Sequence, residues 1–70
     1  MKAIKFYFER VSDVLDLMKA DQFVELINNE DIIVLYNTYI NELTVKFKEP
    51  FDRYSLETVL SLVSFYANYN

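Results

Sequence analysis

The first stretch of the sequence alternates between two sets of side chains. Within KAIKFYFE, one side of an extended chain would carry Ile4, Phe6 and Phe8, and the other Ala3, Lys5, Tyr7 and Glu9. A period of two with aromatic and β-branched residues predicts a half-buried strand. The same alternation returns later, at Leu43, Val45 and Phe47. Helical spacing lies between these two stretches, which predicts a mixed fold of helices and strands.

The residues from Ser12 to about Asn28 predict helix. Ser12 is a good N-cap, and Asp13 and Asp16 fall in the first turn, where the helix dipole favours carboxylates. An apolar stripe follows at helical spacing and consists of Leu17, Ala20, Val24 and Ile27, with Phe23 beside it. Three apolar residues lie outside this stripe, and Asp21 interrupts a second one. One continuous helix and two short helices broken near Asp21 both fit this pattern.

The segment from residue 31 to residue 49 predicts a β-hairpin. β-branched and aromatic residues dominate it, and Pro50 cannot continue a strand ladder. A turn at Asn41 and Glu42 would place Val34, Tyr36, Thr38 and Ile40 on the same face as Leu43, Val45 and Phe47. The competing interpretation is a helix, because Ile32, Leu35, Tyr36, Tyr39 and Leu43 also recur at helical spacing.

The last helix is predicted to begin with Ser55 as its N-cap. At ~100° per residue its side chains fall into three arcs. The core stripe consists of Leu56, Val59, Leu60, Val63 and Ala67, and the polar arc of Glu57, Ser61, Ser64 and Asn68. The third arc carries Leu62, Phe65 and Tyr69, with Tyr66 at its border with the core stripe. The expected fold is therefore a single α+β domain over residues 1–70, in the order β-α-β-β-α, with a three-stranded sheet and two helices packed on one face.

The third arc is more apolar surface than a helix packed on one sheet requires. One explanation is that these side chains meet the first helix or the loop around Phe51 and Tyr54. The functional explanation is a protein interface, because clustered aromatic and long apolar residues are typical of binding hot spots. The predicted partner-binding residues are Leu62, Phe65, Tyr66 and Tyr69.

The composition argues against an enzyme. The chain has no Cys and no His, so it lacks the thiolate and imidazole ligands and bases that many active sites use. Gly is also absent, which removes the glycine-rich loops that cradle phosphates. We expect no catalytic residues, no cofactor and no metal site.

The formal net charge is -4, so direct binding to nucleic acid is not expected. A predicted acidic face follows the first helix and its exit and consists of Asp13, Asp16, Asp21, Glu25, Glu30 and Asp31. Such a row of carboxylates can imitate a nucleic acid and occupy a basic groove on another protein. The simpler interpretation is a solvated helix face that keeps the protein soluble.

Three functions fit these patterns. The first is a small acidic protein-interaction domain, an inhibitor or modulator that binds and blocks a larger host protein. The second is a homodimeric structural or assembly subunit that uses the C-terminal helix as its interface. The third is a sheet that binds single-stranded RNA through Lys5, Tyr7, Tyr39, Lys46 and Lys48, with Ile33 and Leu35 on the same face.

The composition also predicts where the protein occurs. The sequence has 6 Phe and 6 Tyr, with frequent Asn, Ile and Lys, and these residues have AT-rich codons. This usage predicts a low-GC bacterium or one of its phages as the source. The N-terminal residues lack a signal-peptide pattern and no apolar run is long enough to span a membrane, so we expect a cytoplasmic protein with no membrane partner.

Overall fold

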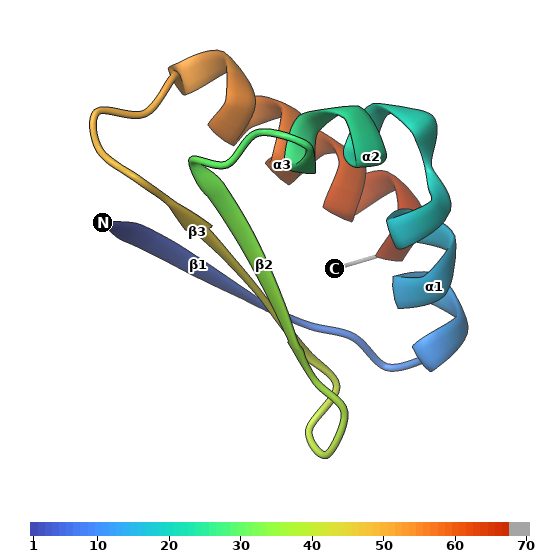
Figure 1. Ribbon diagram of the computed structural model, residues 1–70. Coiled ribbons are helices and arrows are strands. Elements are labelled where there is room, and N and C mark those ends of the chain that lie inside the picture. The colour runs from blue at the N-terminus through green and yellow to red at the C-terminus, as the bar shows by residue number, and fades with distance from the viewer. Residues whose placement is uncertain (68–70) are drawn as a thin grey trace.

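The computed structural model describes residues 1–67. In chain order this part contains β1 (Lys2–Tyr7), α1 (Val11–Lys19), α2 (Asp21–Ile27), β2 (Ile32–Asn37), β3 (Glu42–Phe47) and α3 (Arg53–Ala67). Figure 1 shows one sheet with every helix on the same side of it, which leaves the other face of the sheet open. The predicted α+β class and three-stranded sheet are confirmed, and the strands occur along the chain where they were expected. The predicted count of two helices is wrong, because the described residues form three.

The sheet is antiparallel throughout, and β3 lies between β1 and β2. Phe6 of β1 pairs with Leu43 of β3, which in turn pairs with Tyr36 of β2. Side chains on one face of a strand recur every two residues, so these three point to the helices together. The hairpin prediction for residues 31–49 is therefore confirmed, and the helical alternative for this segment is wrong.

The hairpin turn lies earlier than predicted. β2 ends at Asn37 and Glu42 already belongs to β3, so residues 38–41 form the turn. The Asn37 side-chain oxygen Oδ1 accepts a hydrogen bond from the Tyr39 amide at 3.0 Å, which starts the turn. Asn41 ends it with φ at 51°, in the left-handed region that asparagine tolerates better than most residues. The turn consequently needs no glycine.

The first predicted helix is divided at Ala20, whose backbone is extended with φ -64° and ψ 129°. A continuous helix would place Phe23 opposite Val14, because nine steps of ~100° come to half a turn. The break instead allows both side chains to be buried in the core. The start of α1 also differs from expectation, since Arg10 occupies the N-cap position and Ser12 lies exposed inside the helix.

The core lies between the sheet and the helix layer. Its buried side chains are Phe6, Phe8, Val14, Leu17, Phe23, Ile32, Leu43, Val45, Phe47, Val59, Leu62 and Val63. Both the central strand and all three helices contribute to it, so the helices are held in place by the same apolar cluster. None of the helices in the described part of the chain is long and apolar enough to cross a membrane.

Candidate protein-interaction surface

α3 begins three residues before the predicted position, because Asp52 caps it in place of Ser55. The Asp52 carboxylate accepts a hydrogen bond from the Tyr54 amide at 2.9 Å and another from the Ser55 hydroxyl at 3.3 Å. An aspartate at this position satisfies amides that have no partner within the helix and favours the positive end of its dipole. The prediction of Ser55 as the N-cap is therefore wrong, and Ser55 lies inside the first turn of α3.

The buried face of α3 differs from the predicted core stripe. Leu62 is only 7% exposed and belongs to the core, whereas Leu60 is 41% exposed. α3 packs against both α1 and α2. The placement of Leu62 on an outward arc is therefore wrong, because this residue is a member of the buried core cluster.

Phe65 is the prominent apolar side chain on the outer surface of α3, with 78% of it exposed. Its ring lies edge-on against the ring of Tyr66, with centroids 5.0 Å apart and an interplanar angle of 80°. Tyr66 is half-buried and packs against the core cluster. The core therefore positions Tyr66, and Tyr66 supports the exposed ring of Phe65. Tyr69, the remaining predicted partner-binding residue, lies outside the described residues.

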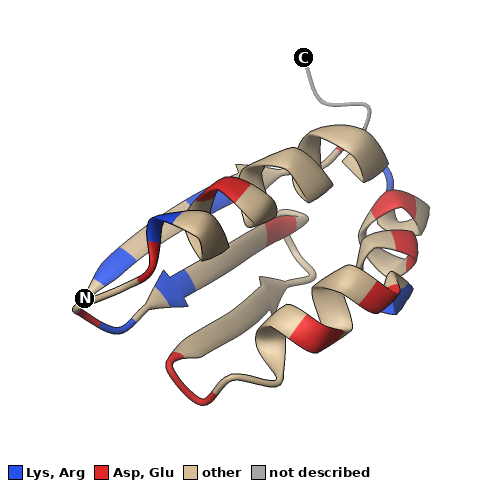
Figure 2. Ribbon diagram, turned by 90° about the horizontal axis from the view of Figure 1, so that it is seen from above, with Lys and Arg blue, Asp and Glu red and all other residues tan. Residues whose placement is uncertain are grey.

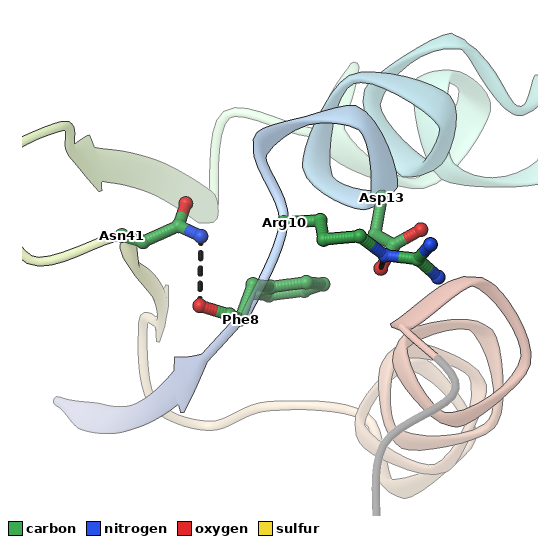
Figure 3. Close-up of polar contacts among 4 residues, drawn as sticks. All are labelled: Phe8, Arg10, Asp13 and Asn41. Carbon is green, nitrogen blue, oxygen red and sulfur yellow. Dashed lines mark hydrogen bonds and ion pairs between the residues drawn. The ribbon is translucent and has the colours of Figure 1, made fainter.

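The first turn of α1 lies beside the last turn of α3, as the two views show (Figures 1 and 3). We call this region the α1–α3 end and define it by Arg10, Val11, Asp13 and Phe65. Val11 is an exposed aliphatic residue, and the Arg10 Nε lies 3.4 Å from an Asp13 carboxylate oxygen. The first turn of α1 thus carries an exposed aliphatic side chain and a surface ion pair, and the last turn of α3 carries an exposed aromatic ring.

The predicted acidic face runs along two helices and a turn instead of one helix. Figure 2 shows the acidic residues on α1, on α2 and in the turn before β2, whereas most basic residues lie on β1 and around the end of β3. Five of the six carboxylates are exposed, and Asp13 is half-buried beside Arg10. Because the chain bends at Ala20, the carboxylates follow the rim of the helix layer and do not form a single straight row.

The open face of the sheet combines charged and apolar side chains. Lys5 lies 3.8 Å from the Glu42 carboxylate, which also accepts a weak hydrogen bond from the Thr44 hydroxyl at 3.5 Å. This carboxylate offsets part of the positive charge that the RNA-binding hypothesis requires on this face. Ile33 and Leu35 are 42% and 49% exposed here, and Tyr39 lies in the hairpin turn with 97% of its side chain exposed.

No group of three or more potential metal ligands occurs among residues 1–67. A groove of about 320 Å³ lies between α2 and α3 and is lined by Gln22, Glu25, Leu26, Asn29, Tyr54 and Thr58. The groove therefore presents amide, hydroxyl and apolar groups together with the carboxylate of Glu25.

Comparison of the chain with protein-family models, with curated proteins and with solved structures gave no match. The geometry of the surface is therefore the basis for inferring a function. Sequence reasoning identified Phe65 as an outward residue, and it missed the exposure of Leu60 and Val11. The alternation typical of a strand correctly placed Ile33 and Leu35, both exposed, on the open face of the sheet.

Proposed function

We propose that this chain is a small acidic protein-interaction domain that binds the surface of a larger protein and thereby blocks or modulates it. The observation that carries the proposal is the exposed Phe65 ring, held by Tyr66 at the α1–α3 end. A phenylalanine this exposed keeps much of its apolar surface in water. Covering apolar surface contributes about 25 cal/mol per Å², so a partner with a complementary pocket gains stability from this ring.

The support from Tyr66 makes Phe65 suited to recognition. A side chain that is free to rotate loses entropy when a partner immobilises it, at a cost of about 0.5–1.5 kcal/mol. The edge-to-face contact with the half-buried Tyr66 already restricts the Phe65 ring. Less entropy is therefore lost on binding, which favours Phe65 as an anchor of the interface.

The charge distribution favours a partner protein with a basic surface. Asp16, Asp21 and Glu25 are exposed on the two helices that lead away from the α1–α3 end. Opposite charges on two proteins increase the rate of their encounter and exclude partners of the same sign. A basic groove of a nucleic-acid-binding protein has the chemistry that this acidic rim would complement.

The test is to isolate the partner and to measure how its affinity depends on Phe65. Tagged wild-type protein would be used for affinity purification from a lysate of a low-GC bacterium, the source that the composition predicts. The recovered protein would then be titrated calorimetrically with wild type, Phe65→Ser and the matched control Tyr39→Ser. Tyr39 is also an exposed aromatic residue, but it lies in the hairpin turn at residues 38–41.

We expect Phe65→Ser to weaken binding by at least about 30-fold, the effect of losing a hot-spot residue. Tyr39→Ser should leave the affinity unchanged, and both variants should retain the wild-type circular dichroism spectrum. Equal affinities of wild type and Phe65→Ser would contradict the proposed surface. Dimerisation of wild type that Phe65→Ser abolishes, with no other protein bound, would instead favour the homodimer predicted through the C-terminal helix.

A further inference from the structure

β2 forms one edge of the sheet, and its outer backbone groups face away from β3. In an antiparallel pair, residues that bond to the neighbouring strand alternate with residues that do not. The Lys48 amide donates to the Asp31 carbonyl at 2.9 Å, so Asp31 is one of the residues that bond to β3. By the alternation, Ile33 and Leu35 also direct their backbone groups toward β3. Val34 and Tyr36 alternate with these residues, so their N–H and C=O groups point away from β3. This edge therefore offers both donors and acceptors to another strand.

The two edges of the sheet differ in how they are protected. Natural proteins protect edge strands with charged side chains, proline, bulges or very short strands. β1 carries Lys2 and Lys5, whereas Ile32–Asn37 contains no charged residue and no proline. β2 also pairs with β3 in an uninterrupted register. Its outer edge thus lacks the features that prevent another strand from pairing with it.

The side chains of β2 and the residue before it are self-complementary around Val34. In an antiparallel pair of two copies centred on Val34, Ile33 of each copy lies opposite Leu35 of the second copy. Both residues are on the open face and about half exposed, so this pairing covers apolar surface on both copies. On the opposite face, Ile32 lies opposite Tyr36 of the second copy.

The ends of this arrangement match in charge and hydrogen bonding. The register that centres on Val34 places the Asp31 carboxylate opposite Asn37 of the second copy. The Asn37 oxygen Oδ1 already accepts the Tyr39 amide at 3.0 Å, which leaves its amide N–H groups to donate to a carboxylate. The two-fold axis repeats this contact at the other end, and no like charges are brought together along the strand.

We propose that β2 is a self-association site, where two copies of the chain pair antiparallel through Val34 and join their sheets into one of six strands. A two-fold interface requires a surface that is complementary to itself, and the residues from Asp31 to Asn37 meet this requirement. This inference is independent of the surface at Phe65, because β2 and α3 present different parts of the molecule (Figure 1).

The test is sedimentation equilibrium of the full chain over a range of concentrations, with three variants. Leu35→Lys introduces a charge opposite Ile33 of the second copy. Ala3→Lys is the matched control, because Ala3 is also exposed on the open face but belongs to β1, so it adds the same charge at the other edge. Ile33→Glu combined with Leu35→Lys places each glutamate opposite a lysine of the second copy, but only in the register centred on Val34.

We expect wild type and Ala3→Lys to dimerise equally, and Leu35→Lys to raise the dimer dissociation constant by roughly tenfold or more. The double variant should restore dimerisation, and all variants should have the wild-type circular dichroism spectrum. A wild type that stays monomeric at every concentration would overturn the proposal. So would a dimer that Leu35→Lys leaves intact, and failure of the double variant to restore association would overturn the register.

Discussion

Asn41 and Phe8 are joined by two hydrogen bonds at the point where β1 leaves the sheet. The Phe8 amide donates to the Asn41 carbonyl at 3.1 Å, and the Asn41 side-chain amide donates to the Phe8 carbonyl at 2.7 Å (Figure 3). The Tyr36 hydroxyl donates to the other side-chain atom of Asn41, its Oδ1. One asparagine therefore connects the hairpin turn to β1, and it does so with a positive φ of 51°.

Replacing Asn41 with alanine is expected to lower the free energy of unfolding by about 2 kcal/mol, because two partly buried side-chain hydrogen bonds are lost and alanine is unfavourable at positive φ. Asn41→Gly loses the same bonds but tolerates the backbone conformation, so it should be less destabilising than Asn41→Ala. Urea unfolding monitored by circular dichroism measures both values. A cost below about 0.5 kcal/mol for Asn41→Ala would show that this connection contributes little.

The N-cap of α3 provides a second prediction. Asp52→Ala should destabilise the protein by about 1 kcal/mol, because it leaves helix amides without their side-chain acceptor. Ser55→Ala, at the position that the sequence predicted as the cap, should cost less than about 0.5 kcal/mol. Thermal unfolding of the two variants distinguishes these roles, and a larger effect at Ser55 would contradict the assignment of Asp52.

The orientation of α3, with Leu62 buried and Leu60 exposed, predicts that substitutions at these two leucines affect stability differently. Leu62→Ala should cost about 2–5 kcal/mol, because it opens a cavity in the core. Leu60→Ala removes a side chain that is 41% exposed, and we expect a smaller change of about 0.5 kcal/mol. The measurement is equilibrium denaturation of both variants under one condition. Equal destabilisation would contradict the observed orientation of the helix.

Most elements of the fold follow from local patterns. The alternation at Ile4, Phe6 and Phe8 predicted β1 because side chains in a strand repeat every two residues. The hairpin was predicted in the same way, with its turn misplaced because no glycine marks it. The N-caps were less predictable. Ser12 and Ser55 are residue types that favour this position, but both lie inside their helices. Where a helix starts depends also on the packing around it, which fixes the last residue with an extended backbone.

The candidate site was predicted in part, because α3 has more apolar residues than one stripe can contain. Helical spacing is satisfied by a stripe with Leu60 and equally by one with Leu62. In the structure α1 and α2 both pack on α3, and it is Leu62 that is buried in the core while Leu60 is 41% exposed. Phe65 shared the predicted arc with Leu62, yet of these two only Phe65 is exposed, at 78%.

The sequence by itself determined the class of the fold, the positions of its strands and helical segments, and an acidic surface, because these depend on composition and on spacing along the chain. Only the tertiary structure decided that β3 is central, that the first helical region divides at Ala20, and which face of α3 is buried. The physical reason is that burial is settled by packing among all elements at once. A side chain such as Leu62 has no fixed environment until a neighbouring helix covers it.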